Sequence, residues 1–360
     1  MRVRIGVVMV GLLALLASGH AAAREPLDPE APHERALDWL AEHQNEDGSW
    51  GGLHTTAVTS LACLAWLAHD EEPYDGKEAQ PLLRGLTFLL SQQKDGVFPK
   101  QGHTWIHGQG FATLALAEAY GRTLFCTHAP DLDVAKLKKA VTQAVATIAA
   151  HQSVSGGWWY VQGSPHGHEG STTVCAVQAL VSAANFGIEI DKTVLAKGFE
   201  YLKRCQNPDG GFDYKEGPGT VSMKEGTAGD VATLALMRKF DYQVMTRGVD
   251  FLKAVGPQGI SKERFPYYGH FYAAMGLVLF GEEMGAEQVA QEYVDGAVQD
   301  VLTWQAEDGS WPLKGWMLSK PQDAAYGTAF AALFLAVSEK RLSIFRRRPP
   351  ELPNRPSESE

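Results

Sequence analysis

The segment Gln305-Ala-Glu-Asp-Gly309-Ser-Trp311 carries the phrase that decides the fold. In it a helical stretch runs into Gln, a polar turn reaches Gly, and an aromatic residue follows. Related phrases begin at Gln44, Gln93, Gln152 and Gln206. A sixth, degenerate copy lies at 248–252 and has Gly256 where Gln is expected. A period of about 50 residues is typical of a repeat array.

Each repeat contains two stretches with the apolar spacing of a helix. The stretch before the Gln has one apolar face, and the stretch after the aromatic residue is apolar almost all round, as in residues 329–336. The first pattern is typical of a helix that covers a core, and the second of a helix buried within one. Six such pairs predict an all-α fold, the (α/α)6 toroid, with six outer helices around six inner helices. We expect the inner helices to begin near Thr55, Gln109, Thr172, Asp230, Tyr268 and Tyr326.

The repeated Gln and aromatic residue have a structural role in this prediction. A Gln amide both donates and accepts hydrogen bonds, so near a helix end it can bridge free carbonyls to free N–H groups of the next repeat. The aromatic residue would pack between helices. We therefore expect these residues to join neighbouring repeats rather than to carry chemistry.

The phrase resembles the QW motif of squalene and oxidosqualene cyclases and the related repeat of protein prenyltransferase β subunits. The resemblance covers about residues 33–340. The ending from Asp323 to Arg346 is similar to that of exported bacterial proteins of this repeat class whose biochemical role is not established. The resemblance implies the toroid fold and leaves the function open.

The N-terminus reads as a secretory signal over residues 1–23. It has Arg2 and Arg4, an apolar core and a small-residue site at Ala21-Ala-Ala23. The apolar core is shorter than the ~20 residues of a spanning helix. We expect an exported protein, periplasmic or extracellular, with no stable membrane span after cleavage.

One toroid domain is predicted for residues 24–340, because evenly spaced repeats run through it without a Pro/Ser-rich break. Residues 341–360 contain Arg346-Arg-Arg348, two prolines and an acidic end, and are predicted to form a disordered tail. The formal net charge of −10 argues against nucleic acid as a partner. The chain lacks CxxC, CxxCH and thioester segments, and no cofactor is predicted.

Polar and aromatic residues recur where the inner helices begin. Aligning the helices gives one layer at His54, His107, Ser171, Thr227, Tyr268 and Tyr326, and a second at Thr56, Gln109, Thr173, Gly229, His270 and Thr328. Such residues can form a ligand-facing rim or cap helix starts. The predicted ligand-binding rim comprises His54, Thr56, His107, Gln109, Thr173, Tyr268 and Tyr326.

Asp230 and His270 are the candidate catalytic residues. Asp230 is the only carboxylate that aligns inside the inner ring, opposite Gly110 of the second repeat, and His270 begins the fifth inner helix. The Asp-x-Asp-Asp acid motif of squalene-type cyclases is absent. The zinc site of prenyltransferase β subunits has Cys two residues after Asp, whereas Ala232 follows Asp230 here. His103 and His107 have an i, i+4 spacing, but no metal site is predicted.

Three function classes remain open on the sequence. The first is a binding or scaffold role toward an apolar, isoprenoid-like or peptide ligand without the classical chemistry. The second is a divergent isoprenoid or lipid cyclase or transferase that uses Asp230. The third is a polysaccharide-cleaving enzyme, because α/α toroids also serve carbohydrate chemistry. The sequence leaves the ligand and the oligomeric state unassigned.

Overall fold

The computed structural model describes residues 30–127, 131–217, 221–238, 240–314 and 324–353. Within these residues the chain forms twelve α-helices, two short 3₁₀ helices and isolated β-bridges. The predicted all-α fold is confirmed. The predicted signal peptide, residues 1–23, lies outside the described residues.

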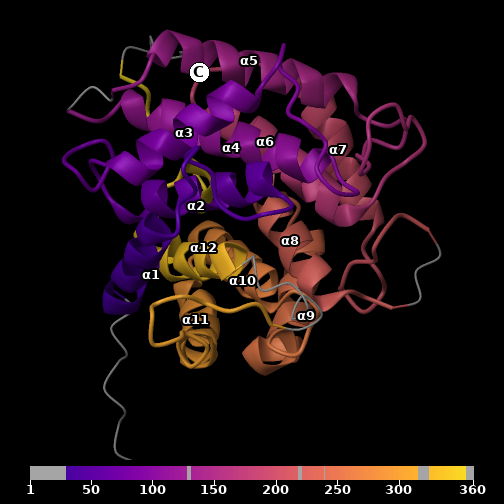
Figure 1. The fold of residues 1–360 in the computed structure, drawn as a ribbon. Helices are drawn as coiled ribbons and strands as arrows, with labels where there is room; N and C mark the ends of the chain where they lie inside the picture. The colour runs from indigo at the N-terminus through magenta and orange to yellow at the C-terminus, as the bar shows by residue number, and fades with distance from the viewer. Residues whose placement is uncertain (1–29, 128–130, 218–220, 239, 315–323, 354–360) are drawn as a thin grey trace, which may run out of the picture.

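Six amphipathic helices form the outer ring, because each has an apolar face toward the core and a polar face toward solvent. Figure 1 shows them at the periphery, with α5 at the top, α7 on the right and α11 at the bottom. They are α1 (Glu30–Glu42), α3 (Gln80–Gln92), α5 (Val134–Ala150), α7 (Lys192–Arg204), α9 (Tyr242–Ile260) and α11 (Glu287–Leu302).

Six largely buried helices form the inner ring. They are α2 (Thr55–His69), α4 (Ile106–Thr123), α6 (Gly170–Asn185), α8 (Lys224–Ala235), α10 (Pro266–Met284) and α12 (Ala324–Ala336). Each packs against the next, and α12 packs against α2, which closes the ring. The predicted (α/α)6 arrangement of six hairpins is therefore observed.

The start of α8 differs from the prediction. It begins at Lys224, not near Asp230, because the segment Lys224-Glu-Gly-Thr-Ala-Gly229 is helical. Its two glycines and polar residues lower helix propensity, but burial against the neighbouring helices α6 and α10 outweighs that preference. Asp230 consequently lies inside the helix rather than at its N-terminus.

The motif glutamines join neighbouring repeats, as predicted, although they do so by donating to carbonyl groups. Gln206 Nε2 donates to the Gly210 carbonyl of its own turn at 3.0 Å and to the Val244 carbonyl of α9 at 2.9 Å. Gln305 Nε2 donates to Gly309 and to Pro32 of α1 at 2.9 Å. The last bond links the sixth repeat to the first and completes the outer ring.

The prediction of a disordered tail from residue 341 is wrong for the segment 342–345. Leu342, Ser343, Ile344 and Phe345 are all at most 2% exposed, and Ser343–Phe345 form a 3₁₀ helix. The segment is short but carries three large apolar side chains, and their burial outweighs the charged and Pro-rich composition that follows. Residues 354–360 lie outside the described part.

Helices of the described residues do not combine the length and apolar character that a membrane crossing requires.

Candidate functional site

A layer of side chains near the start of the inner helices sets the register of the ring. Each accepts a hydrogen bond from the backbone N–H of the motif aromatic residue: Trp50 to Thr59, Phe98 to Gln109, Trp158 to Thr173, Phe212 to Thr227 and Trp311 to Thr328, at 2.8–3.1 Å. We call these residues, with His270 at the same level of α10, the anchor layer.

The anchor layer faces the outer ring, so two predicted rim residues are structural. Gln109 and Thr173 are fully buried. Gln109 Nε2 also donates to the Gly96 carbonyl at 2.9 Å, and Thr173 Oγ1 donates to the Glu169 carbonyl at 2.7 Å. Their assignment to a ligand-binding rim is therefore wrong. These positions point away from the ring axis because they must reach the motif turn on the outer side.

The first repeat was misaligned in the sequence, which affects two more predicted rim residues. Thr59, not Thr56, occupies the anchor position of α2. Thr56 is fully buried against the neighbouring inner helix near Gly108, and its Oγ1 has no hydrogen-bond partner within the part of the chain that the structure describes. His54 is the N-cap residue of α2 and lies against Gly102 and the His103 ring, 6.0 Å away.

Two residues before the anchor layer lies a ring of side chains at the start of the inner helices. We call it the mouth ring; it comprises Ala57, His107, Ser171, Glu225, Tyr268 and Tyr326. All except Glu225 are partly exposed, and buried helix follows, as in α4 from Gly108 to Gly121. The predicted rim residues His107, Tyr268 and Tyr326 thus share one level of the toroid.

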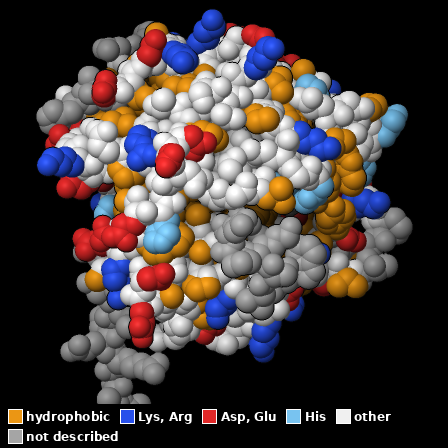
Figure 2. Space-filling view, viewed as in Figure 1, with side chains coloured by type: hydrophobic (Ala, Val, Ile, Leu, Met, Phe, Trp, Pro, Cys, Tyr) orange, Lys and Arg blue, Asp and Glu red, His pale blue; other side chains and the backbone are white. Residues whose placement is uncertain are grey.

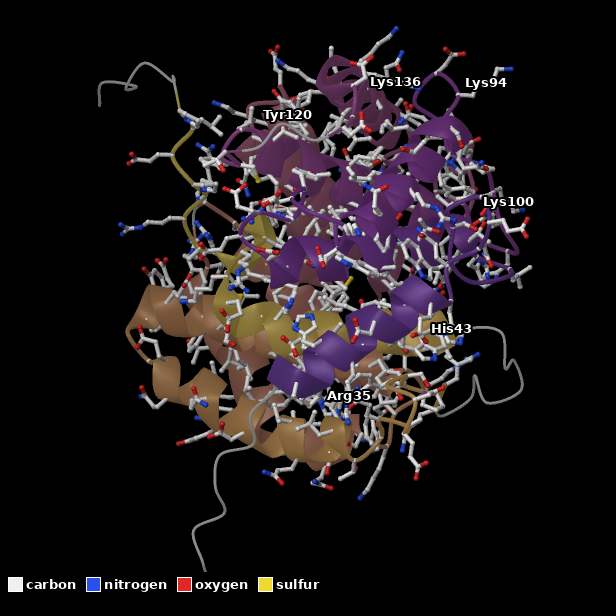
Figure 3. The ribbon with its side chains drawn as sticks, turned by 60° about the vertical axis from the view of Figure 1, so that its left-hand side comes forward. Arg35, His43, Lys94, Lys100, Tyr120 and Lys136 are labelled. Atoms are coloured by element: carbon white, nitrogen blue, oxygen red, sulfur yellow. The ribbon has the colours of Figure 1, made fainter. Side chains whose placement is uncertain are left out.

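The mouth and the opposite end of the inner ring are well separated. Figure 3 shows Lys94 and Lys100, in the loop before α4, on the right of the molecule, and Tyr120, near the end of α4, on the left. Figure 2 shows hydrophobic and histidine side chains gathered on the right of the visible face, next to the position of α7 in Figure 1. We call the end near Tyr120 the distal end.

His270, the second candidate catalytic residue, makes its hydrogen bonds to residues other than Asp230. His270 belongs to the anchor layer and faces the outer helices: its ring nitrogens lie 3.0 Å from Ser261 Oγ and 3.1 Å from the Tyr293 hydroxyl. Burial lowers its pKa to about 4, so the imidazole is neutral near pH 7. Its geometry is that of a structural histidine.

Asp230 occupies an exceptional position in the inner ring. It lies three residues after the anchor residue, where the other five inner helices have Ala62, Ala112, Ala176, Ala273 and Ala331. All five alanines are buried, and Asp230 is only 1% exposed. A carboxyl group thus replaces a methyl group at a tightly packed level of the ring. The corrected register aligns Asp230 with Ala112 rather than with Gly110.

The Asp230 carboxyl faces the start of α6. A Cβ added at Gly170 would lie 3.6 Å from both carboxyl oxygens, so at Gly170 no side chain stands between them and the backbone of α6. The Oδ1 atom is buried and has no hydrogen-bond partner among the described residues. Burial, and next the charge of Glu169, raise the Asp230 pKa well above its usual value, which favours the protonated carboxyl.

The Tyr268 hydroxyl is a second polar group without a partner in the described part of the chain. It lies over Gly229, where an added Cβ would come within 2.4 Å of the hydroxyl oxygen. Burial raises the Tyr268 pKa well above its usual value, with smaller contributions from neighbours that include Asp230 and Glu169. Tyr268 and Asp230 therefore present two neutral hydrogen-bonding groups in one region.

A hydrogen-bonded chain runs along the other side of the mouth ring. Ser171 Oγ donates to Glu169 Oε1 at 2.7 Å and lies 3.3 Å from His107 Nε2, and His107 Nδ1 lies 2.8 Å from Thr104 Oγ1. Glu169 also caps α6 by accepting from the backbone N–H groups of Ser171 and Thr172. Burial lowers the His107 pKa to about 4, so the His107 imidazole in this series of hydrogen bonds is uncharged near pH 7.

Aromatic loop residues flank this chain. The Tyr160 ring lies 5.7 Å from His107 and 5.6 Å from His103, and its hydroxyl is 2.8 Å from the Tyr214 hydroxyl. His168 instead approaches the Tyr201 hydroxyl at 3.1 Å. In the described ranges no three His, Cys, Asp or Glu side chains are placed to hold a metal ion.

Aromatic rings pack across the axis beneath the mouth ring. The Phe330 ring lies 4.9 Å from Tyr326, 6.1 Å from Tyr268, 5.7 Å from Phe271 and 6.3 Å from Phe111. These residues come from α4, α10 and α12. The level beneath the mouth ring, which we call the aromatic floor, is therefore apolar, while the mouth ring carries the polar groups of Tyr268, Ser171 and His107.

A separate hollow of about 500 Å³ lies on the outer surface. It is lined by Val154, Ser155, Ala196, Lys197, Glu200, Arg204 and Glu216. Arg204 and Glu216 form an ion pair at 2.6 Å in it. Its wide opening and paired charges distinguish it from the mouth, where polar atoms lack partners.

The register of Asp230 is the signal that sequence alignment missed. Five inner helices have a buried alanine at this equivalent position and the sixth has Asp230, which is seen only when the anchor residues are aligned. The glycines at the start of α8 obscured that alignment. Ser171 is among the helix-start residues that the sequence predicts, but its contact with His107 depends on the packing of α4 against α6.

Several solved structures resemble this fold. A variant of the type II terpene cyclase MstE from Scytonema superposes with a TM-score of 0.59 at 18% identity, covering 87% of this chain and 98% of that one. MstE in complex with geranylgeranyl dihydroxybenzoate gives 0.56 at 19%, with 87% and 98% covered. The α-1,6-mannanase from Salegentibacter sp. HEL1_6 gives 0.63 at 11%, with 86% and 98% covered.

Such identities establish a shared fold only. Among curated proteins no sequence matches. The sequence does match the family model described as prenyltransferase alpha-alpha toroid domain, over residues 9–195 and 182–256. These matches span more than half of the chain and agree with the double ring of helices. The chain therefore belongs to the prenyltransferase alpha-alpha toroid domain family.

Proposed function

We propose that this protein binds a small, mainly apolar, isoprenoid-like ligand at the mouth of the toroid, with a polar end group near Tyr268 and Asp230. The observation that carries the proposal is a pair of buried polar atoms, Tyr268 Oη and Asp230 Oδ1, that have no hydrogen-bond partner among the described residues. A buried polar group without a hydrogen bond costs about 1–3 kcal/mol. A ligand that supplies the missing partner recovers this free energy.

The chemistry of the two groups favours a neutral polar end. A protonated carboxyl and a tyrosine hydroxyl each donate one hydrogen bond and accept others. An alcohol or carbonyl oxygen matches such a pair. A ligand carboxylate would instead be repelled by the negative charge of Glu169, which already raises the Asp230 pKa. The aromatic floor of Phe330, Phe111 and Tyr326 supplies apolar contact for the rest of the ligand.

Binding of geranylgeraniol to the purified protein, followed by quenching of Trp fluorescence, tests the proposal. The Tyr268→Phe variant keeps the ring and loses only the hydroxyl, so its affinity should fall about fivefold, the equivalent of one hydrogen bond. Tyr120→Phe, at the distal end, is the matched control and should bind as the native protein does. A folded native protein that binds no prenyl alcohol would overturn the proposal, as would equal affinities of the native and Tyr268→Phe proteins.

The second candidate is a divergent isoprenoid cyclase or transferase, in which Asp230 donates a proton to the bound ligand. The raised pKa of the Asp230 carboxyl favours it, because a general acid must hold its proton at the working pH. Incubation with prenyl substrates and mass spectrometry of the extract distinguishes the two functions. Turnover that disappears in Asp230→Asn, with ligand binding retained, supports the enzyme; binding without turnover supports the binding protein.

Polysaccharide cleavage is the weaker proposal. It draws on the fold shared with an α-1,6-mannanase and on the aromatic residues Trp159, Tyr160 and Tyr214 near the mouth. Release of reducing ends from α-1,6-mannan would favour it over both other functions. Export of the protein through its signal peptide remains part of our proposal and is tested by detecting the mature N-terminus outside the cytoplasm.

A further inference from the structure

The distal end of the inner ring is occupied by the chain's own C-terminal segment. Phe345 is fully buried, with its ring 5.9 Å from that of Phe271 on α10. Leu342 and Ile344 are buried as well. The segment packs against α6 and α10. In Figure 3 the C-terminal part of the ribbon, in yellow, runs along the left of the molecule, on the side of Tyr120.

A buried carboxyl group holds the segment by its backbone. Glu118 of α4 accepts hydrogen bonds from the Ser343 N–H at 2.8 Å and from Ser343 Oγ at 2.6 Å. Ser182 Oγ of α6 donates to the same carboxyl group at 2.8 Å. Asn185 Nδ2 donates to Ser343 Oγ at 3.1 Å. Two neighbouring inner helices therefore provide a polar recess for one serine.

These polar groups are exceptions in the ring. Eleven residues after the mouth ring, the other inner helices have Ala68, Leu236, Leu279 and Val337, while α4 and α6 have Glu118 and Ser182. Both exceptions bind Ser343, directly or through the shared carboxyl group. The recess is thus specific to the segment and is not a general feature of the repeat.

Charged groups extend the recognition on both sides of the buried residues. Lys340 pairs with Glu282 of α10. The Arg347 N–H donates to Glu282 Oε2 at 2.8 Å, and the Arg347 side chain pairs with Glu283 at 2.8 Å. The Arg347 guanidinium also lies 5.2 Å from the centre of the Phe240 ring. The residues that these cationic groups contact, Glu282, Glu283 and Phe240, all belong to the toroid and not to the C-terminal segment.

The connection to the toroid is a sharp turn at Lys340, whose φ of 54° places it in the left-handed region. A residue with a Cβ is destabilised in this conformation by about 1 kcal/mol or more. The segment therefore follows a strained turn after α12 and is held by its own contacts.

We propose that the distal end is a peptide-binding site, filled in cis by residues 341–347, and that a peptide of the same Leu-Ser-aliphatic-Phe-Arg-Arg pattern can replace this segment in trans. In this site Glu118 accepts hydrogen bonds from a backbone N–H and a serine hydroxyl of the peptide. Phe271 contacts an aromatic side chain of the peptide, and Glu283 pairs with an arginine. In the intact chain the tether gives the cis segment an effective concentration in the millimolar range. A trans peptide therefore competes only when the cis segment is weakened.

The test uses the full-length chain and a fluorescein-labelled peptide with the sequence of residues 341–348, followed by fluorescence anisotropy. We expect the Phe345→Ala chain to bind the peptide at least tenfold more tightly than the native chain does. Leu352→Ala, farther along the same tail, is the matched control and should behave as the native chain. A peptide that itself carries Phe345→Ala should not bind.

Adding Glu118→Gln to the Phe345→Ala chain checks the site and should weaken peptide binding at least tenfold. If Phe345→Ala does not melt cooperatively, the milder Ser343→Ala chain takes its place. Absence of peptide binding to a folded weakened chain overturns the proposal, as does equal binding of the native and Phe345→Ala peptides. Loss of cooperative melting in both chains also overturns it, because the segment would then be an inseparable part of the core.

Discussion

Two buried carboxyl groups lie toward opposite ends of the inner ring, and their surroundings differ. Glu118, toward the distal end, receives hydrogen bonds from Ser343 and Ser182. Asp230, toward the mouth, has an Oδ1 atom without a partner among the described residues. Burial raises the pKa of both groups. Each stands where most of the other inner helices have a small or apolar residue.

The difference indicates which of the two carboxyl groups finds its hydrogen-bond partners within the described residues. Buried polar groups in native proteins nearly always have hydrogen-bond partners, and each exception requires an explanation. At the distal end the chain supplies the partner itself, from a segment far along the sequence. For Asp230 no described residue supplies the partner, and a ligand is the explanation we propose. The following predictions test this contrast, from the largest expected effect to the smallest.

Removing the aromatic side chain of the C-terminal segment should have the largest effect on stability. Phe345→Ala deletes a fully buried ring, and such truncations cost about 3–5 kcal/mol. Urea unfolding of the full-length protein measures the change. Leu352→Ala, at a partly exposed site of the same tail, should cost less than about 1 kcal/mol. Similar effects of the two substitutions would contradict the assignment of the segment to the core.

Removing the distal carboxyl group should come second. Glu118→Ala leaves the Ser343 N–H and the Ser182 hydroxyl without their acceptor, so we expect a loss of about 3 kcal/mol in the free energy of unfolding. Urea unfolding at pH 7 gives the value. A loss below about 1 kcal/mol would show that the recess does not hold the segment.

The repeat pattern predicted the fold well because it is local and redundant. Six hairpins, the buried inner helices and the joining role of the glutamines all follow from a phrase that recurs along the chain. The start of α8 did not follow, since Lys224 to Gly229 have low helix propensity and become helical only through packing on α6 and α10. The shifted start misplaced Asp230 in the alignment.

The sites depended on contacts that the sequence does not contain. Ser343 meets Glu118 across 225 positions of sequence, and the charged, Pro-rich residues after Phe345 favoured a disordered tail. Of the predicted rim, His107, Tyr268 and Tyr326 lie in the mouth ring, whereas Gln109 and Thr173 face outward. The candidate catalytic residue His270 faces outward as well. Polar residue type alone does not distinguish the side of a helix that faces the axis from the side that anchors the outer turn.

Removing the mouth carboxyl group should have little effect on stability at low pH and a favourable one at neutral pH. Asp230→Ala restores the alanine of the other repeats and breaks no hydrogen bond to the carboxyl group in the described structure. The folded-state pKa of Asp230 is raised above the ordinary value of 3.8, so the folded state holds the proton that the unfolded state releases. The contribution of Asp230 to native stability therefore decreases as pH rises above about 4.

Urea unfolding of the native and Asp230→Ala proteins between pH 4 and 7 measures this linkage. We expect the variant to be within about 1 kcal/mol of the native protein at pH 4 and relatively more stable at pH 7. Asp230→Ala should also weaken binding of geranylgeraniol. A variant that loses stability relative to the native protein as pH rises would show that the ionised Asp230 carboxylate has a stabilising partner in the folded protein.

The smallest stability effect is expected for a substitution at Gly170. Such a variant tests whether a ligand reaches Asp230 past this position, and it leaves the Asp230 carboxyl group unchanged. A Cβ added there makes ordinary contact with both Asp230 oxygens at 3.6 Å, so Gly170→Ala should fit without a clash. Replacing a helical Gly by Ala stabilises by about 0.4–1 kcal/mol through the unfolded chain. Gly108→Ala, in the first turn of α4 with its nearest contact at 3.7 Å to Thr56, is the matched control.

Both variants should melt at or slightly above the native temperature, but only Gly170→Ala covers the carboxyl group and should bind geranylgeraniol several-fold more weakly. Equal binding by the two variants would show that ligands do not approach Asp230 past the start of α6, and the polar end group would then have to be assigned to Tyr268 alone.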